Sequence, residues 1–332
     1  MQISEKYKEK YLGMRETMRI NTKQFGMSAD FLYSKPNDAF DYRYSIQYYF
    51  FEGDFGKCGK LLADGESKFP GSPELALARG IILQYTGKPE EALEQIDAAL
   101  SKNGSNLEFA IIKADLLLDL KKYREALQFL KPYESSNPDS YHLLLYLAMF
   151  SQSCKEFPQS LDYATRARQC QNYDPNIEKY LTQQIAYSHQ FSGDAKEAVK
   201  ILQKYCEGKG FDKDLKYQIM FAAEKDMDYS LMTKSATEIL KMEKTDATAL
   251  FFRGFGNYIS GRFKNGLKDG NRLVHLYPNS EDGYIIRILN LDGLGYTYEK
   301  MKDDIEMLEK LERLEGKGKP GIIESVKSFL RI

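Results

Sequence analysis

Two short stretches of the sequence contain the residue types of ligand-binding loops, but each lacks one required residue. GDFGKCGK, residues 53–60, has the glycines and the lysine of a phosphate-binding loop. Such a loop needs Ser or Thr directly after its lysine, and Leu61 stands there instead. EKDMD, residues 224–228, spaces three acids as a calcium loop does, yet Tyr229 occupies the place of the required glycine. We therefore expect neither a nucleotide site nor a calcium site.

Residue types that serve catalysis or bind metals are scattered along the chain. No histidine has a Cys, Asp or Glu at metal-ligand spacing, and the three stand far apart, at His142, His189 and His275. The cysteines form no CxxC pair, which is typical of a reducing compartment; they are Cys58, Cys154, Cys170 and Cys206. No Ser, His and Asp grouping or paired-carboxylate motif stands out. We predict that the chain is not an enzyme and uses no cofactor or metal.

Composition narrows the class of protein. The chain has 332 residues, of which 42% are hydrophobic, so it can bury a sizeable core. Its formal net charge of -1 gives no reason to expect nucleic-acid binding, although it leaves room for a local basic patch. The first twenty residues mix acids with bases and resemble no targeting peptide, and the most apolar run, Leu143 to Phe150, is too short to span a bilayer. These features predict a cytoplasmic protein, with the nucleus left open.

The sequence contains an internal repeat. Turn-like residues recur every 34 residues, with one step of 38 after the fourth, at Gly53, Gly87, Lys121, Lys155, Gly193, Met227, Gly261 and Gly295. If each unit starts fourteen residues before its turn, its eighth position is small or apolar: Ile46, Gly80, Ala114, Ala148, Ala186, Met220, Gly254 and Ile288. The twentieth position holds Cys58, Ala92, Ala126, Ser160, Ala198, Met232, Gly266 and Lys300. Small side chains at these places let the two helices of a unit approach closely.

This pattern resembles the tetratricopeptide repeat family, whose motif has small residues at positions eight and twenty and an aromatic residue after the turn. The resemblance implies an all-α, right-handed superhelical solenoid of about eight helical hairpins. The chain departs from the family in lacking Trp, so that Tyr42 and Leu144 stand where the family has a large aromatic or similar residue in units one and four. Pro132 falls late in the second helix of the third unit, which we expect it to end early.

The repeat register divides the chain into three parts. Residues 39–314 form eight units, with boundaries at 39–72, 73–106, 107–140, 141–178, 179–212, 213–246, 247–280 and 281–314. Residues 1–38 form an N-terminal helical arm or cap, in which Ile3, Tyr7, Tyr11, Met14 and Met18 share one stripe. Residues 315–332 form a C-terminal capping helix that covers the last unit. Both terminal segments have an alternative interpretation as partner-binding arms.

In the family's fold, the first helix of each unit lines a concave groove, chiefly through positions two, five, nine and twelve. The resemblance therefore implies a partner-binding groove that includes Phe40, Arg43, Gln47, Glu74, Leu77, Ile81, Glu108, Ile111, Asp115, Leu145, Met149, Tyr180, Tyr187, Tyr217, Phe221, Phe251, Phe255, Tyr258, Asp282 and Ile285. Across all the lining positions there are seven acids and one base, Arg43; the acids are Glu74, Glu108, Asp115, Asp214, Glu224, Asp282 and Asp292. We expect an apolar, aromatic and acidic groove.

These observations favour a protein-interaction scaffold or adaptor, a subunit of a larger assembly that binds a basic-hydrophobic or amphipathic segment of a partner. Family members that capture acidic chaperone tails need Lys, Arg and Asn in three consecutive units, a set that this chain lacks, so that role is disfavoured. Two alternatives stay open: a regulatory or targeting partner of an enzyme, and a self-associating structural protein. Partner identity, biological process and oligomeric state are not written in the sequence.

Overall fold

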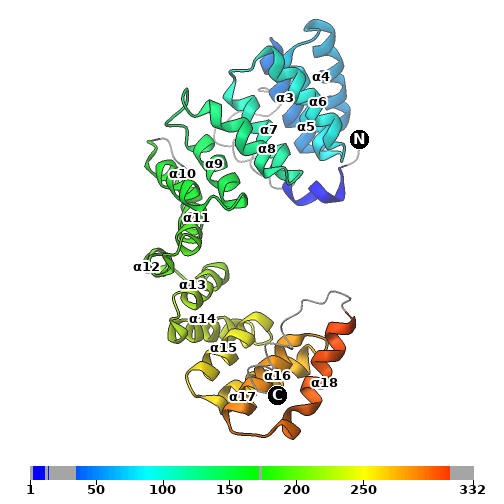
Figure 1. Cartoon of the computed structure of the whole chain (residues 1–332). Coiled ribbons are helices and arrows are strands. Elements are labelled where there is room, and N and C mark those ends of the chain that lie inside the picture. The colour runs from blue at the N-terminus through cyan, green and yellow to red at the C-terminus, as the bar shows by residue number, and fades with distance from the viewer. Residues whose placement is uncertain (1–2, 12–13, 15–34, 172–173, 315–332) are drawn as a thin grey trace. The chain divides into compact units, whose positions relative to one another are not determined.

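Every element in the described part of the chain is a helix. The structure, a computed structural model, describes residues 3–11, 14, 35–171 and 174–314 and divides into two compact units, Met1–Tyr173 and Asp174–Ile332 (Figure 1). The predicted capping helix at 315–332 lies outside the described residues, as do Met18 and most of the predicted arm beyond residue 11. Each unit is described by itself below.

The first unit consists of four consecutive helical hairpins in which each helix packs on the next. Their helices are α3 (Ala39–Glu52) with α4 (Phe55–Lys68), α5 (Pro73–Tyr85) with α6 (Pro89–Lys102), α7 (Leu107–Asp119) with α8 (Tyr123–Leu130), and α9 (Tyr141–Ser153) with α10 (Phe157–Gln169). First helices also pack on first helices, α3 on α5 and α7 on α9. Helix α8 ends at Leu130, just before a 3-10 turn that contains Pro132, as its sequence predicts.

The second unit repeats this arrangement. After a 3-10 turn at Pro175–Ile177, its hairpins are α11 (Glu178–Phe191) with α12 (Ala195–Cys206), α13 (Lys213–Lys225) with α14 (Tyr229–Met242), α15 (Ala247–Ile259) with α16 (Phe263–Leu276), and α17 (Glu281–Gly293) with α18 (Tyr298–Leu314). Aspartates begin several of these helices, because an aspartate side chain accepts a hydrogen bond from a free backbone N–H of the first turn. Asp194, Asp212, Asp228 and Asp246 are such N-caps.

The eight turn residues share one backbone conformation. Gly53, Gly87, Lys121, Lys155, Gly193, Met227, Gly261 and Gly295 all have positive φ, between 57° and 94°. Glycine adopts this left-handed region without a steric cost, whereas Lys121, Lys155 and Met227 adopt it against the preference of their side chains. The regular spacing of these residues thus reflects a left-handed turn that closes every hairpin.

The small-residue positions lie inside the hairpins. All eight residues at position eight are buried, and at position twenty seven are buried, from Cys58 to Gly266. Lys300 is exposed, and Met301 is buried in its place, at 3% exposure. The turn between α17 and α18 has four residues, Leu294 to Thr297, one more than the turn between α15 and α16. This extra residue shifts the register of α18 by one position.

A recurring ion pair shows the same shift. In the seventh hairpin the Arg253 guanidinium lies 2.6 Å from the Asp269 carboxylate, and in the eighth Arg287 is paired with Asp304 in the same way. The arginines are 34 residues apart but the aspartates are 35 apart. Both carboxylate side chains are only 5% exposed, so each pair ties the second helix of a hairpin to its first.

The packing at position twenty makes a testable prediction about Ala92. Its side chain is fully buried, and the backbone of Gly80 approaches its carbonyl oxygen so closely that a Cβ on Gly80 would lie 3.2 Å away. Changing Ala92 to Leu should lower the free energy of unfolding by about 1–3 kcal/mol through overpacking. The matched control is Ala98→Leu, because Ala98 is an exposed alanine of the same helix. Equal melting temperatures for the two variants in thermal denaturation would contradict the register.

Candidate functional site

The predicted lining residues differ in how accessible the structure leaves them. Four are exposed: Phe40, Glu108, Tyr180 and Phe221. Thirteen are partly buried: Gln47, Glu74, Ile111, Asp115, Leu145, Met149, Tyr187, Tyr217, Phe251, Phe255, Tyr258, Asp282 and Ile285. Three are buried: Arg43, Leu77 and Ile81. The accessible aromatic residues are therefore concentrated in the second unit.

Arg43 is not available to a partner, contrary to its predicted place in the groove. The side chain is fully buried, with Nη1 2.7 Å from Glu108 Oε1 and Nε 2.8 Å from Glu74 Oε2. The guanidinium also lies over the rings of Phe40 and Tyr44. A buried guanidinium requires such partners, because an uncompensated charge inside a protein is strongly unfavourable. Arg43 thus ties the first three hairpins together and neutralises two of the acids that the sequence assigns to the groove.

Leu77 and Ile81 also belong to the interior rather than to a binding surface. Leu77 is fully buried and Ile81 is 8% exposed, and both lie in the hydrophobic core of the first unit. The same core includes Tyr7 and Tyr11 of the N-terminal segment. Several lining positions of the first unit are therefore covered by the chain itself.

The second unit presents a continuous row of aromatic rings on its first helices α13 and α15. We call this row the aromatic ladder and define it as Tyr217, Phe221, Phe252, Phe251 and Phe255. The rings of Tyr217 and Phe221 are stacked at 6.1 Å, and those of Phe251 and Phe255 at 6.4 Å. Phe221 meets Phe252 edge to face at 5.3 Å, which joins the two helices. Phe221 is 37% exposed, so the ladder reaches solvent.

Tyrosines next to the ladder carry perturbed hydroxyls. Burial, and then a hydrogen bond to Asp246, raise the pKa of Tyr217 to about 12. Burial alone raises the pKa of Tyr180 on α11 to about 12. Both tyrosines therefore stay neutral at physiological pH, and this side of the second unit presents rings and hydroxyls rather than phenolate charge.

The charged groups of the first helices in this unit are unevenly satisfied. Most cations pair with acids of the same unit: Lys179 with Asp212, Lys213 with Asp246, Lys216 with Glu238, Arg253 with Asp269, and Arg287 with Asp304. Among the described residues, Asp282 and Asp292 on α17 take part in no ion pair. Asp214 has a side chain that is 76% exposed and lies 3.5 Å from Lys179. The accessible charge beside the ladder is thus mainly acidic.

Solved structures with the same arrangement of hairpins are numerous. A tetratricopeptide repeat protein from Parabacteroides merdae superposes with a TM-score of 0.56 and 13% identity, covering 78% of this chain and 99% of that chain. The C-terminal part of a repeat-containing protein from Cytophaga hutchinsonii superposes with a TM-score of 0.58 and 13% identity, covering 71% and 95%. PilW, described as a type IV pilus biogenesis factor, superposes with a TM-score of 0.51 and 16% identity, covering 61% and 92%.

The chain has the tetratricopeptide-repeat fold. At these identities the likeness shows the fold alone, and it confirms the resemblance that the sequence indicates. No protein-family model matches the chain, and no curated protein matches it. The repeats are therefore recognisable from their period and packing, while their consensus residues have diverged.

Two aromatic residues on the first helices of the repeats were missed at the sequence stage of reasoning. Phe252, the link between α13 and α15, occupies position six of its repeat, and Phe191, which is 42% exposed, occupies position thirteen. The missed signal is an i, i+4 spacing of aromatics: Phe191 follows Tyr187 by four residues, and their rings lie 4.4 Å apart. Phe255 follows Phe251 by the same interval. Such pairs meet on one side of a helix.

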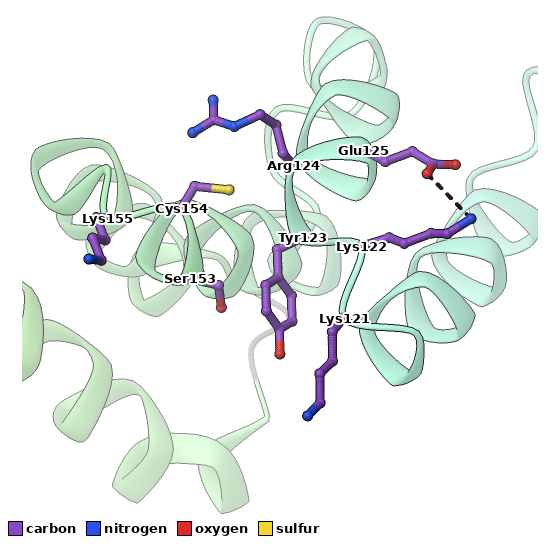
Figure 2. A pocket seen from close by; sticks show the side chains of 8 residues that line it. All are labelled: Lys121, Lys122, Tyr123, Arg124, Glu125, Ser153, Cys154 and Lys155. Carbon is purple, nitrogen blue, oxygen red and sulfur yellow. Dashed lines mark ion pairs between the residues drawn. The ribbon is translucent and has the colours of Figure 1, made fainter. Parts of the chain in front are cut away.

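A basic pocket lies at the turns of the third and fourth repeats. Its volume is about 470 Å³, and its lining, shown in Figure 2, consists of Lys121, Lys122, Tyr123, Arg124, Glu125, Ser153, Cys154 and Lys155. Glu125 lies 3.7 Å from Lys122, and Glu156 lies 3.4 Å from Arg124. Two of its four cations are thus neutralised within the repeats, which leaves the pocket only weakly positive.

Three further findings concern the part of the chain that the structure describes. No group of three or more His, Cys, Asp or Glu side chains there is arranged to hold a metal ion. None of the helices in that part combines the length and the apolar composition needed to cross a membrane. All four cysteines are free thiols, and burial raises the pKa of the Cys58 thiol to about 11. Cys58 is therefore a packing residue of its hairpin rather than a reactive thiol.

Proposed function

We propose that this chain is a non-enzymatic protein-interaction scaffold that binds an amphipathic or basic-hydrophobic segment of a partner protein along the aromatic ladder. The observation that carries the proposal is the ladder itself, a row of rings that crosses two repeats and reaches solvent at Phe221. Large rings supply most of the affinity at protein interfaces, and a helical segment with apolar residues three and four apart matches such a row.

The charges beside the ladder support a basic rather than an acidic partner. The cations of the first helices are largely held by acids of their own repeats, whereas Asp214 and Asp282 remain accessible. Complementary charge speeds encounter with a basic segment and disfavours an acidic one. The partner that fits best therefore carries Lys or Arg beside its apolar anchors.

Photo-crosslinking tests this assignment. A photoreactive phenylalanine analogue placed at Phe221 or at Tyr180 of the full chain should give the same partner adduct in extracts of the native cell. Tyr296 is the control position, because it is 49% exposed but lies in the turn between α17 and α18. Mass spectrometry of the adducts should identify a basic-hydrophobic partner peptide. Adducts that form equally from Tyr296, or only with acidic peptides, would contradict the proposal.

A further inference from the structure

The N-terminal segment Ile3–Tyr11 lies across the ends of three first helices in the first unit. The backbone N–H of Ser4 donates to the carbonyl of Tyr85, at the end of α5, at 2.9 Å. The Tyr11 hydroxyl donates to the carbonyl of Phe50 in α3 at 2.6 Å. Lys6 Nζ donates to the carbonyl of Asp119, the last residue of α7, at 3.2 Å.

These contacts explain why a basic segment is held at this edge. The last carbonyls of a helix have no partners within the helix, and the C-terminal end carries partial negative charge. The three ends that α3, α5 and α7 bring to this segment therefore favour donors and cations. The segment supplies a donor to each of them, so that it completes three helix termini at once.

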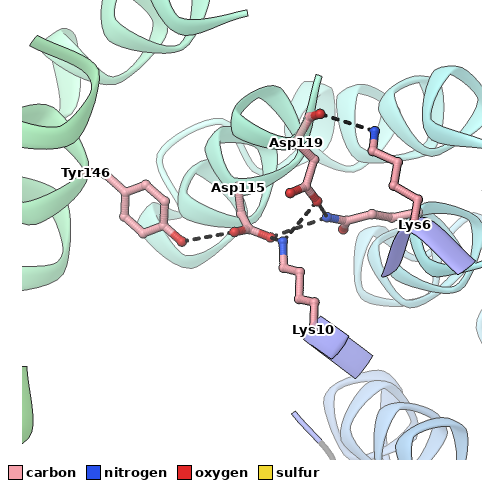
Figure 3. Close-up of polar contacts among 6 residues, drawn as sticks. Lys6, Lys10, Asp115, Asp119 and Tyr146 are labelled. Atoms are coloured by element: carbon pink, nitrogen blue, oxygen red, sulfur yellow. Dashed lines mark hydrogen bonds and ion pairs between the residues drawn. The ribbon is translucent and has the colours of Figure 1, made fainter. Parts of the chain in front are cut away.

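The deepest charged contact of the segment is made by Lys10. Its Nζ lies 2.6 Å from Asp115 Oδ2 and 2.9 Å from Asp119 Oδ2, as Figure 3 shows. Gln84 donates to Asp119 at 2.6 Å, and Tyr146 donates to Asp115 at 3.3 Å. We call these four acceptor-side residues, Gln84, Asp115, Asp119 and Tyr146, the lysine socket.

The socket favours a charged lysine. Burial opposes the ammonium form, but Asp115 and Asp119 outweigh it, so that the pKa of Lys10 is raised above its ordinary value. Without a cation, two neighbouring carboxylates would face each other, with like charges, at the same place. The socket is thus built for a cation, and its two carboxylates come from one turn of α7.

The apolar contacts of the segment repeat at the same interval as its lysines. Tyr7 and Tyr11 are 2% and 7% exposed. The Tyr7 ring lies 5.8 Å from that of Tyr85, and the Tyr11 ring lies 5.6 Å from that of Phe50. Each tyrosine directly follows a lysine, Lys6 or Lys10, and the two Lys-Tyr pairs are four residues apart, about one helical turn.

We propose that this edge of the first unit is a binding site for partner segments with Lys-aromatic pairs four residues apart, and that Ile3–Tyr11 occupies it as a built-in competitor. A helix this short is unstable by itself, so its order depends on the site and the site opens whenever the segment detaches. A partner segment of the same chemistry binds by displacing it. The proposal concerns the first unit and is independent of the aromatic ladder in the second.

The test uses the full chain and a labelled peptide with the sequence of residues 1–14. The Lys10→Glu chain, whose own segment is weakened, should bind this peptide at least tenfold more tightly than the wild-type chain, as measured by fluorescence anisotropy. Two variant peptides of equal net charge provide the matched comparison. Lys8→Glu should keep its affinity, because Lys8 is 60% exposed and pairs only locally with Glu5, whereas Lys10→Glu should lose at least tenfold.

Hydrogen exchange of the wild-type chain provides a second measurement that needs no chain variant. Excess unlabelled Lys8→Glu peptide should accelerate amide exchange in residues 3–11, because it competes for the site, and the Lys10→Glu peptide should not. Equal affinities for the two variant peptides, equal binding to both chains, or unchanged exchange would overturn the proposal. Failure of the aromatic ladder would leave all three results unaltered, since the Phe251→Ala, Phe255→Ala chain should bind the peptide as the wild-type chain does.

Discussion

Changing Phe251 and Phe255 together to alanine should weaken binding of the partner segment about thirtyfold or more. The two rings are stacked and form one end of the aromatic ladder. Buried rings at the centre of an interface each contribute on the order of 1–2 kcal/mol, and each 1.4 kcal/mol corresponds to a tenfold change in affinity. The effect should appear chiefly in the dissociation rate, which surface-immobilised kinetics measures directly.

The comparison variant for this experiment changes Asp282 and Asp292 to asparagine. Neither acid takes part in an ion pair among the described residues, so the change leaves the recorded charge network intact. This variant should lower the association rate and its sensitivity to salt, while the dissociation rate stays close to wild type. Circular dichroism melting should show that both variants are folded at the temperature of measurement. A double Phe variant that folds normally and binds as wild type does would remove the ladder from the binding site.

Changing Gly283 to alanine should cost about 3 kcal/mol of stability, near the upper end of overpacking effects. A Cβ at Gly283 would lie 2.7 Å from the backbone nitrogen of Val274, and one at Gly270 would lie 2.9 Å from that of Arg287. Helices α16 and α17 therefore touch through their backbones, which cannot rotate away as side chains do. For a unit of this size the loss corresponds to a fall in melting temperature of roughly 6–12 °C.

Gly59→Ala is the control for this prediction. Gly59 is also inside a helix, α4, but a Cβ there would meet nothing within 4 Å. Alanine should therefore leave stability unchanged or raise it slightly, since glycine is the poorer helix former. If Gly283→Ala melts at the wild-type temperature in differential scanning calorimetry, the close approach of α16 and α17 does not exist in solution.

The fold was predictable because a repeated sequence repeats its packing. A period of 34 residues places one chemical type at the same point of every hairpin, so that position eight is buried in all eight repeats. Pro132 could be read as the end of a helix because proline lacks the N–H and clashes with the preceding turn. The shift at Met301 could not be read, because one added turn residue leaves the helical pattern of α18 intact and changes only its phase.

The candidate site was only partly predictable. Repeat register correctly brought Tyr217, Phe221, Phe251 and Phe255 to the first helices of neighbouring repeats, because period and position alone determine which helix carries them. It assigned Arg43 to an accessible face, where the structure has a buried ion pair. The partners of Arg43, Glu74 and Glu108, come from the next two repeats, and a pattern within one repeat carries no information about them.

The sequence alone determined the class of this protein: an all-α repeat chain with left-handed turns, small residues inside each hairpin and aromatic residues on the first helices. Only the tertiary structure decided which of those first-helix residues remain accessible. Tyr7, Lys10 and Tyr11 cover part of the first unit through contacts to residues 39 to 109 positions away. Contacts over such separations depend on where the folded hairpins place their ends, whereas helical periodicity acts over a few residues and therefore leaves them undetermined.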